Sequence, residues 1–482
     1  MFKYIKVVAI VIFTFSIFSN AQNITDAVRI AEPGVLTSAS SLGMGNATMG
    51  NNIGYSNYLN NPAALGLMRN SEVVFSFNFD SIASDNSYFN NKLSNNQNAN
   101  GINNFGLAYK MPTSQGSLVF GFGYSKIKNF NNITDFSGFN HGNNSLIQDL
   151  TSVNSQLTYD LRLSHAVYDA SDNYLYDETY INGNLQQDGL ITESGNIDDW
   201  QFSGAVEIAK GLFVGATLNF LGGTYSNDRE YNETDTRNIY GSNLQMDPDD
   251  PLTVDFKKFY VNDNIQWDIS GVNLKAGFLY EFSSMLKLAG AIQTPTSYKI
   301  NETYFVQGSS YFQNDYGYDV TPQTSKQDYA ISTPFIYSFG ASADLMFFSL
   351  NAETELIDYT QTEFTDGFTF AERVEKNKEI SNNLRFAPRY KIGLVAKIPS
   401  TGISVKGGFM YLNSPYKNAE SENAKKYFTA GVSVLSESNF GVDIAGAYGY
   451  WKDYLDVYGS NIARVNRDVN DLKVVVSLKY IF

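Results

Sequence analysis

Apolar and polar residues alternate one by one along much of this chain, as they do in β-strands with one apolar and one polar face. Residues 470–482, NDLKVVVSLKYIF, show the pattern clearly. One face carries Leu472, Val474, Val476, Leu478, Tyr480 and Phe482, and the other carries Lys473, Ser477 and Lys479. From residue 71 onward the alternation predicts fourteen strands, at residues 71–79, 102–111, 117–127, 198–209, 211–224, 265–282, 285–299, 333–343, 345–358, 386–398, 402–412, 426–435, 440–451 and 471–482.

The connections between these strands alternate in length. Connections of 13 to 70 residues and connections of 1 to 5 residues follow each other without exception. Outer-membrane barrels show this rhythm because their hairpins turn tightly in the periplasm and carry long loops outside. A soluble sandwich also hides alternating apolar faces, but it has no reason for such connections. We therefore predict an all-β fold, a transmembrane antiparallel β-barrel of 14 strands at residues 71–482 with long extracellular loops.

The first residues predict export. Residues 1–21 read as a signal peptide, because Lys3 and Lys6 precede an apolar run at residues 7–18 and small residues allow cleavage after Ala21. No later stretch reaches the roughly 20 apolar residues of a spanning helix. The chain has no cysteine, so we expect neither a lipid anchor on cysteine nor disulfides. The predicted location is the bacterial outer membrane.

Aromatic residues and charge refine this prediction. Trp200, Trp267 and Trp451 fall near predicted outer strand ends, where an aromatic girdle would meet lipid headgroups. The predicted strand 265–282 moves its apolar residues to the other face near Gly271, which indicates a β-bulge or a strand rising above the bilayer. A net charge of −15 without basic runs gives no footing for nucleic acid.

Two long connections carry further predictions. The long outer loop 128–197 has apolar residues at helical spacing, and Ser145 before them is a candidate N-cap. The apolar residues are Leu146, Leu150, Val153, Leu157 and Leu161. Such a helix either plugs the barrel mouth or lines a site for a hydrophobic ligand. Alternatively, residues 156–163 form a strand, and a hairpin within 156–182 would raise the strand count. The segment 86–104, rich in Asn and Ser, predicts a mobile loop.

Residues 22–70 are not strand-like and predict a plug. The stretch SLGMGNATMGNNIGYSNYLNNPAAL, residues 41–65, is rich in glycine and small residues that permit a tight, irregular backbone. Nucleotide binding is disfavoured, because no strand precedes these glycines and no Lys-Ser or Lys-Thr follows them. A segment of this length before the first strand can pack inside a barrel.

The sequence resembles the FadL/TodX family of outer-membrane transport proteins for hydrophobic compounds. The motifs LGMGNA, residues 42–47, and NNPAAL, residues 60–65, resemble the amino-terminal hatch of that family. RFAPRYKIGLVAKIP and VKGGFMYLNSPY resemble its later strands, so the likeness lies in patches over most of the chain. The hatch residues matched in this way are Gly43, Gly45, Asn46, Asn61, Pro62 and Ala63.

The resemblance implies a monomeric fourteen-stranded barrel with the hatch in its lumen, helices in the outer loops and a lateral opening at a kink in the third strand. In this chain the third predicted strand contains VFGFGYS, so Gly121 and Gly123 are the residues expected to relax its pairing. The chain departs from the family pattern because its largest loop, 128–197, follows that strand directly. The substrate site of the family is therefore not transferred.

Charged residues on the predicted inner face offer two interpretations. Seven bases, Lys287, Arg389, Lys391, Lys397, Lys406, Lys473 and Lys479, stand against four acids, Glu207, Glu353, Glu355 and Asp443. These charges either pair across the lumen and with the plug or bind the carboxylate head of a ligand. Arg389 and Lys391 are the candidates for ligand contact, together with Leu146, Leu150, Val153 and Leu157 of the loop helix.

Signals for chemistry are weak. Both histidines, His141 and His165, lie in the long loop, which leaves a Ser-His-Asp arrangement on the barrel wall without its base. The acids of MDPDDP, residues 246–251, lack the spacing of an EF-hand and read as a solvated loop. We expect no enzyme, no cofactor and no metal.

The predicted function is passive transport of hydrophobic small molecules such as long-chain fatty acids, with hatch gating and lateral release. The alternative is a docking or scaffold subunit of an outer-membrane secretion or assembly complex, and a porin for polar solutes is a third possibility. Expected partners are a lipid-like ligand, outer-membrane lipid and lipopolysaccharide, the barrel-assembly machinery, and proteins at the outer loops. Tyr480 and Phe482 are the expected signal for barrel assembly.

Overall fold

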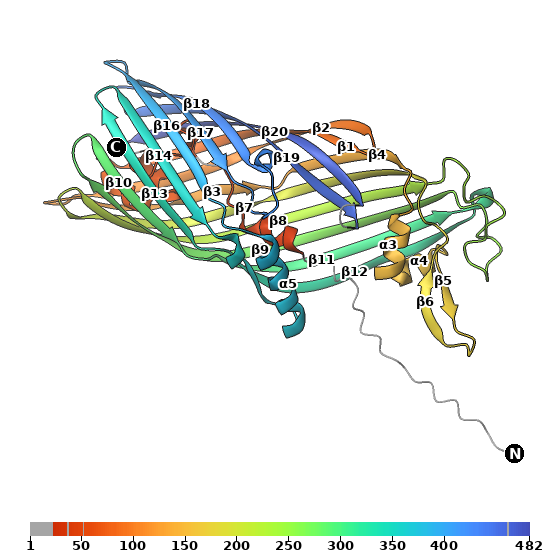
Figure 1. Ribbon diagram of the computed structural model, residues 1–482. Helices are drawn as coiled ribbons and strands as arrows, with labels where there is room; N and C mark the ends of the chain where they lie inside the picture. The colour runs from red at the N-terminus through yellow and green to blue at the C-terminus, as the bar shows by residue number, and fades with distance from the viewer. Residues whose placement is uncertain (1–22, 36–37, 52, 460–461) are drawn as a thin grey trace.

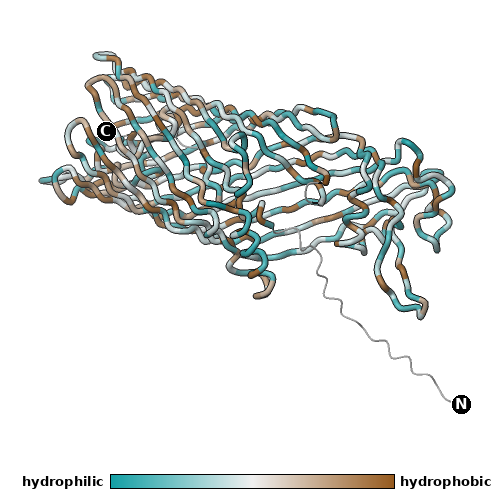
Figure 2. Tube along the Cα trace, in the orientation of Figure 1, coloured by the Kyte–Doolittle hydropathy of each residue, from teal (hydrophilic) through white to brown (hydrophobic). Residues whose placement is uncertain are grey.

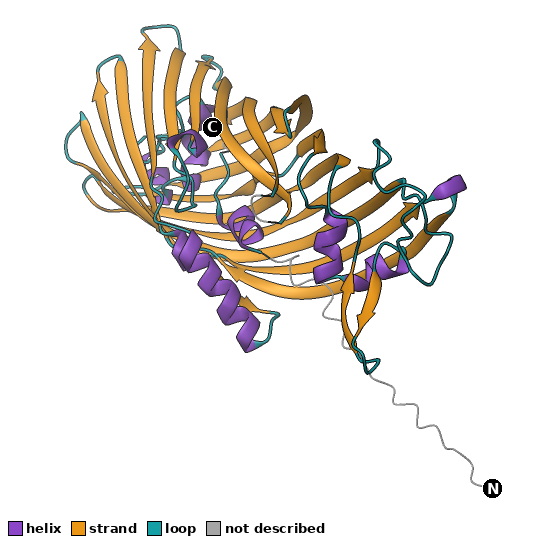
Figure 3. Ribbon diagram, turned by 45° about the vertical axis from the view of Figure 1, so that its right-hand side comes forward, coloured by secondary structure: helices purple, strands orange, loops and turns teal. Residues whose placement is uncertain are grey.

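A computed structural model describes residues 23–35, 38–51, 53–459 and 462–482. The predicted signal peptide and its cleavage site lie outside these residues. The described chain forms a long tube of antiparallel strands with short helices inside it and at one rim (Figures 1 and 3). None of the described helices has the length and apolar character needed to cross a membrane.

The wall is a closed antiparallel barrel of 14 strands, as predicted. Each wall strand pairs with its neighbours, and closure occurs where the last strand pairs with the first, from Glu72 opposite Ile481 to Ser87 opposite Asn466. The wall strands are β1 (Glu72–Tyr88), β2 (Asn91–Met111), β3 (Leu118–Asn129), β7 (Leu185–Ala209), β8 (Leu212–Thr234), β9 (Lys258–Glu281), β10 (Leu286–Gln293), β13 (Ile336–Leu345), β14 (Phe348–Ile357), β16 (Arg389–Ile398), β17 (Ile403–Leu412), β18 (Lys425–Leu435), β19 (Phe440–Tyr458) and β20 (Ala463–Ile481).

Shorter elements complete the fold. Strands β4 (Asn132–Asn140), β11 (Ser297–Tyr311), β12 (Gly317–Ser332) and β15 (Glu363–Asp366) extend the wall, and β5 (His165–Tyr168) pairs with β6 (Tyr174–Glu178) in a separate sheet. The helices are α1 (Ile24–Ala31), α2 (Ala39–Leu42), α3 (Leu146–Val153), α4 (Ser155–Asp160) and α5 (Phe370–Asn383). The 3₁₀ turns are η1 (Gly54–Leu59), η2 (Pro62–Leu67), η3 (Gln313–Asp315), η4 (Tyr359–Gln361) and η5 (Ser421–Asn423).

The wall presents an apolar band to the outside at the end with short turns. Phe77, Phe122 and Ile392, from three different strands, are 43%, 40% and 53% exposed. In each of these strands the residues on either side of the exposed one face inward. Figure 2 shows the hydrophobic colour gathered toward this end and a more hydrophilic trace toward the other. We call these the turn end and the loop end. A band of this kind suits a lipid environment because barrel strands run apolar-out and polar-in.

The wall is much taller on one side. Strand β7 has 25 residues and β9 has 24, whereas β14 and β16 have 10 each. The tall side continues past the apolar band toward the loop end, where α3, α4 and the β5–β6 hairpin lie (Figure 1). The barrel is therefore prolonged at the loop end by an extension outside the apolar band.

The prediction of a mobile loop at residues 86–104 is wrong. These residues form the outer part of the β1–β2 hairpin, paired from Glu72 opposite Ala108 to Tyr88 opposite Asn91. Polar side chains bridge the two strands, including Asn86 to Asn95 at 3.2 Å and Ser94 to Asp85 at 2.6 Å. Cross-strand hydrogen bonds supply the pairing energy that apolar residues supply elsewhere, so a polar composition did not indicate disorder here.

The alternative of a strand at residues 156–163 is also wrong, because α4 covers most of this segment. The β5–β6 hairpin does form within residues 156–182, but it belongs to a separate sheet and leaves the barrel count unchanged.

Of the three tryptophans predicted to form an outward-facing aromatic girdle, one is exposed on the outside of the barrel. Trp200 is 44% exposed on the outside, whereas Trp267 is 1% exposed inside the barrel and donates a hydrogen bond to Glu302 at 2.9 Å. Trp451 packs beside Tyr427 and lines an internal cavity. Strand β9 has no bulge near Gly271, because its pairing with β8 and β11 continues through that residue. The apolar residues change face because the lumen itself contains an apolar cluster around Trp267 and Ile269.

Candidate ligand-binding lumen

Residues 23–35, 38–51 and 53–70, which we call the N-terminal segment, lie inside the barrel (Figure 1). Local signals fix its short helices. Asn23 caps α1 in a capping box with Asp26, Ser38 caps α2, and the Asn61 side chain accepts a hydrogen bond from Ala63 N with Pro62 at the start of η2. The sequence motifs therefore encode turns that fit a compact segment.

Asparagine side chains tie this segment together and to the wall. Asn46 accepts from Ser41 Oγ at 3.0 Å and donates to Val35 O at 3.2 Å. Asn61 Nδ2 lies 3.1 Å from both Met49 O and Phe278 O, and the second of these belongs to β9. The structure thus brings Gly43, Gly45, Asn46, Asn61, Pro62 and Ala63, the residues of the sequence motifs, into one buried body in the lumen.

Glycines of the wall make room for this body. A Cβ at Gly215 would lie 2.6 Å from Pro62 C, and one at Gly277 would lie 2.0 Å from Asn61 Oδ1. On another part of the wall, a Cβ at Gly408 would lie 2.3 Å from Gly45 N. Sequence reasoning missed these contacts, although one signal was present, since several predicted strands carry a glycine on the inner face: Gly106, Gly123, Gly215, Gly277, Gly340, Gly393, Gly408 and Gly431.

Gly121 and Gly123 do not relax the pairing of the third strand. Gly121 pairs with Ala108 and Ser203, and Gly123 pairs with Gly106 and Gln201, so the ladder is continuous on both sides. Gly123 instead gives space to Tyr55, because a Cβ there would lie 2.2 Å from Tyr55 Oη. The prediction mistook a packing requirement for a weakness in the sheet.

The wall is irregular a few residues nearer the loop end. The pairing of β2 with β3 ends at Asn104 opposite Ser125, and β3 shifts register against β7 at Ile127. Beyond this point Gln97 and Ala99 of β2 line a cavity together with Ile127 and residues 128–132. An interior cavity therefore reaches the wall where these two strands part.

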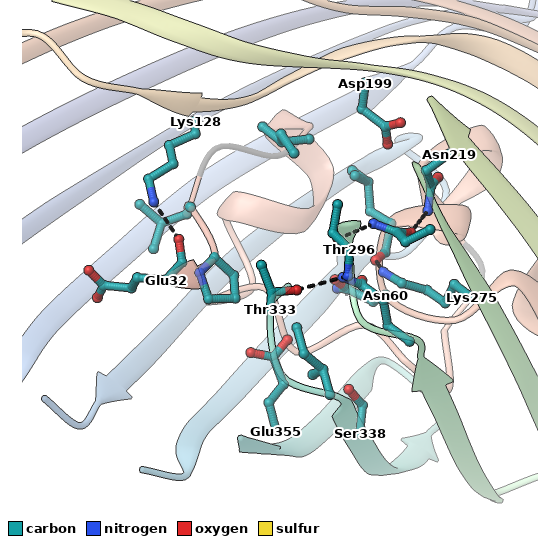
Figure 4. A pocket seen from close by; sticks show the side chains of 18 of the residues that line it. Glu32, Asn60, Lys128, Asp199, Asn219, Lys275, Thr296, Thr333, Ser338 and Glu355 are labelled. Carbon is teal, nitrogen blue, oxygen red and sulfur yellow. Dashed lines mark hydrogen bonds between the residues drawn. The ribbon is translucent and has the colours of Figure 1, made fainter. Parts of the chain in front are cut away.

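Two cavities remain beside the N-terminal segment. The first has a volume of about 160 Å³ and lies between the segment and strands β7, β8, β9 and β16 (Figure 4). The second has a volume of about 240 Å³ and faces β1, β3, β18, β19 and β20. Residues 32–35 line both cavities and therefore separate them.

Glu32 fixes this partition by ion pairs. Its carboxylate receives Lys425 Nζ at 2.8 Å and lies 3.7 Å from Arg389 Nη2, while Lys128 donates to the main-chain oxygen of Glu32 at 2.6 Å. Burial alone would raise the pKa of Glu32, but Lys425, Arg389 and Lys128 outweigh it and lower that pKa to about 2. The partition is held in place by charges from three wall strands.

Arg389 and Lys391, the predicted ligand contacts, are engaged within the protein. Lys391 Nζ lies 2.9 Å from Glu353 and 2.6 Å from Glu355, and Arg389 donates to Pro33 O at 3.0 Å. Of the two interpretations given for the inward charges, these contacts agree with the first, in which bases pair with acids of the lumen and with the N-terminal segment.

The other predicted inward charges are mostly paired as well. Lys287 pairs with Asp344, Lys473 with Asp471 and Lys479 with Asp443, and Lys406 donates to Ser40 of the N-terminal segment at 2.5 Å. Lys397 is exposed, and Glu207 accepts from Gly211 N at 2.8 Å near the turn end.

The loop helices α3 and α4 pack against the wall in an apolar cluster at the loop end. Leu146 and Leu157 are 2% and 6% exposed within an apolar cluster, and Leu150 packs partly against it, whereas Val153 is 53% exposed. Glu233 of β8 accepts hydrogen bonds from Leu146 N at 2.8 Å and Ile147 N at 3.3 Å, which holds the start of α3. Four of these residues were predicted to contact ligand, and Val153 points away from the cluster that the others share.

The remaining candidates have ordinary partners. The ring of His141 lies 4.7 Å from Phe139 and that of His165 lies 4.8 Å from Tyr180. Asp247 of the acidic loop pairs with Arg162 at 3.2 Å, and Asp250 accepts from Tyr318. Among the described residues no cluster of His, Asp and Glu is arranged to hold a metal ion.

The sequence and the structure were compared with those of known proteins. No family model matches the sequence, and no curated protein matches it. A FadL homologue from Pseudomonas aeruginosa matches in structure with a TM-score of 0.57 at 12% identity, covering 92% of this chain and 98% of its own. This chain has the fold of the FadL-like channels. The resemblance stated from the sequence is thereby confirmed for the fold.

Two further FadL-like structures agree. The toluene transporter TodX of Pseudomonas putida matches with a TM-score of 0.53 at 10% identity, covering 92% of this chain and 98% of its own. The CymD monoaromatic hydrocarbon channel matches with a TM-score of 0.51 at 13% identity, covering 93% of this chain and 99% of its own.

The C-terminal residues close the FadL-like barrel and face outward. Phe482 N donates to Ser71 O at 2.9 Å, and Ser71 N donates back to Phe482 O at 3.1 Å. Tyr480 and Phe482 are 47% and 54% exposed, and their rings stack with centroids 6.2 Å apart. They lie in the outward apolar band and contact neither cavity.

Proposed function

We propose that this protein is a passive channel of the bacterial outer membrane for hydrophobic small molecules, with long-chain fatty acids among its substrates. The observation that carries the proposal is a lumen occupied by the N-terminal segment that still holds two cavities divided by residues 32–35. The matching structures named for toluene and monoaromatic hydrocarbons support the same class of cargo. No energy source is needed if consumption inside the cell removes the product.

In this proposal the N-terminal segment is the gate. Cargo enters at the loop end, reaches the second cavity and leaves sideways where β2 and β3 part, next to Gln97 and Ile127. Movement of residues 32–35 joins the two cavities and opens the path toward the turn end. Breaking the ion pairs of Glu32 is the event that this movement requires.

The gate can be tested with a reversible crosslink, because the chain contains no cysteine. Ala39 N lies 3.2 Å from Ser477 Oγ, so a pair of cysteines at these positions tethers α2 to β20. Cells carrying Ala39→Cys with Ser477→Cys should lose uptake of labelled toluene and oleate when oxidised and regain it on reduction. Each single cysteine variant is the control, and unchanged uptake in the oxidised double variant contradicts hatch gating.

Substrate class is tested separately. A deletion strain should take up labelled toluene and oleate more slowly than the same strain with the gene restored, while uptake of a small sugar stays equal. Equal uptake of both hydrophobic compounds in the two strains contradicts the transport proposal.

One observation favours a docking role as the second candidate. The β5–β6 hairpin projects from the loop end (Figure 3), and Tyr168, Tyr174, Leu175 and Tyr176 on it are between 53% and 57% exposed. Exposed aromatic clusters mark interaction sites. Under the docking proposal, detergent extraction recovers a stoichiometric complex that is lost when residues 169–173 are shortened, while hydrophobic uptake does not change. Recovery of a single subunit with impaired uptake favours transport.

A further inference from the structure

The lumen-facing side of β7, β8 and β9 changes character at the first cavity. Toward the loop end it carries Ile197 and Leu221, which are 1% and 6% exposed. Toward the turn end the next inward positions carry Asp199, Asn219 and Asn273, all lining the same cavity. The wall of the cavity therefore passes from apolar to polar along the barrel axis.

Asp199 stands out among the polar residues of this cavity. Its residue surface is 5% exposed, and its Oδ1 has no hydrogen-bond partner among the described residues. Figure 4 shows its carboxylate directed from β7 into the cavity, on the side of Asn219. A buried carboxylate oxygen without a donor costs free energy unless a bound molecule supplies one.

The donors near Asp199 are committed elsewhere. Asn219 donates to Asn273 at 2.7 Å, and Asn273 donates to Thr296 at 2.7 Å. Lys275, which also lines the cavity, donates to the main-chain oxygen of Leu59. None of these side chains is turned to Asp199.

Two of the bases around the cavity, Lys391 and Arg389, are balanced by acids of the protein. Lys391 is held by Glu353 and Glu355, and Arg389 lies near Glu355 and Glu32. An incoming carboxylate would find these two bases occupied by acids of the protein. A cationic head instead gains a charge-assisted hydrogen bond with an acid that lacks one.

We propose that the first cavity binds the protonated amine of a small aliphatic primary amine, with the ammonium on Asp199 and the alkyl chain along Ile197 and Leu221. This inference rests on the proposed function and names a class of cargo for it. The order of the wall residues orients the ligand with its head toward the turn end and its tail toward the loop end. Amphiphiles of this kind therefore pass head first.

The test measures binding of three ligands with the same chain, octylamine, octan-1-ol and octanoate, by calorimetry on the full protein in detergent at pH 7. Octylamine should bind wild type about tenfold more tightly than the other two, which corresponds to about 1.4 kcal/mol. Asp199→Asn should weaken octylamine about tenfold and leave octan-1-ol unchanged. Asp198→Asn is the matched control, because Asp198 lies on the opposite face of β7 and accepts from Tyr124 at 2.8 Å.

The inference is overturned if Asp199→Asn binds octylamine as tightly as wild type, or if octanoate binds wild type at least as tightly as octylamine. Asp199→Ser serves if the Asn variant does not show the heat-resistant band of a folded barrel. Wild type that binds octan-1-ol with no preference for the amine refutes this inference and leaves the proposed function standing. Wild type that binds none of the three refutes both.

Discussion

The ring of Tyr55 in the N-terminal segment lies so close to Gly106 of β2 that a Cβ on this glycine would be 2.0 Å from Tyr55 Cε1. Tyr55 is fully buried, its hydroxyl lies within hydrogen-bond distance of the side-chain amide of Gln201 at 2.5 Å, and its ring lies 4.9 Å from that of Tyr58. Tyr55 thus joins the N-terminal segment to the wall, and it fits there because Gly106 has no side chain.

Gly106→Ala should loosen the plug by about 1–3 kcal/mol, because overpacking a buried contact forces its neighbours to move. Tyr55→Ala in the same chain should remove most of that effect, so the two changes should be strongly non-additive. The measurement is entry of small hydrophilic dyes into cells, together with the temperature at which the compact gel band unfolds. Gly204→Ala is the control, since a Cβ there meets Phe120 only at 3.7 Å. Additive effects of the two changes contradict the contact.

Lys391→Met should destabilise the seated plug by about 3 kcal/mol, because it leaves two buried acids without their shared base. Lys391 bonds both Glu353 and Glu355, and Glu353 also accepts from Thr48 N of the plug at 3.1 Å. Lys397→Met, on the same strand but exposed, should have almost no effect. Protease cleavage within the N-terminal segment measures the difference, and equal cleavage of both variants contradicts the role of this ion pair.

The stability contributed by Glu32 should depend on pH in a defined window. Its pKa in the folded protein is about 2, against an ordinary value of 4.5, so the carboxylate stabilises the folded state above pH 4.5 and loses this contribution as the pH falls toward 2. The shift corresponds to about 3 kcal/mol.

Wild type and Glu32→Gln should therefore differ most in unfolding temperature above pH 4.5 and converge near pH 2. Glu437→Gln, at an exposed position, should follow wild type throughout. A difference between wild type and Glu32→Gln that is the same at pH 6 and at pH 2.5 would count against the ion pairs with Lys425 and Arg389.

Tyr480→Ala combined with Phe482→Ala should lower the amount of protein in the outer membrane severalfold. These rings face outward at the strand that closes the barrel and touch no internal cavity. The protein that is inserted should keep its heat-resistant band and its ligand affinity. Tyr454→Ala removes a ring that is 52% exposed on β19 and should leave the amount unchanged. Normal insertion of the double variant would show that the closing strand needs no terminal aromatic residues.

Much of the barrel could be predicted because its signal is local. Side chains two residues apart share a face of a strand, so a stretch such as residues 471–482 reveals its two faces without knowledge of its partners. The same holds for the turns of the N-terminal segment, where Asn61 and Pro62 act on residues beside them. The polar segment 86–104 escaped prediction because its hydrogen bonds join different strands.

The sequence by itself determined where the wall strands lie, their alternating faces and the presence of a compact segment before the first strand, because each depends on residues close in the chain. Only the tertiary structure decided what the lumen contains. Lys425 pairs with Glu32, which is 393 residues away in the sequence, and Gly106 leaves space for Tyr55. Trp267 is buried inside the barrel. These contacts form because the closed barrel places distant strands around one interior. The alternation of a strand says which side chains face the lumen, but their partners there depend on how the barrel closes around the N-terminal segment.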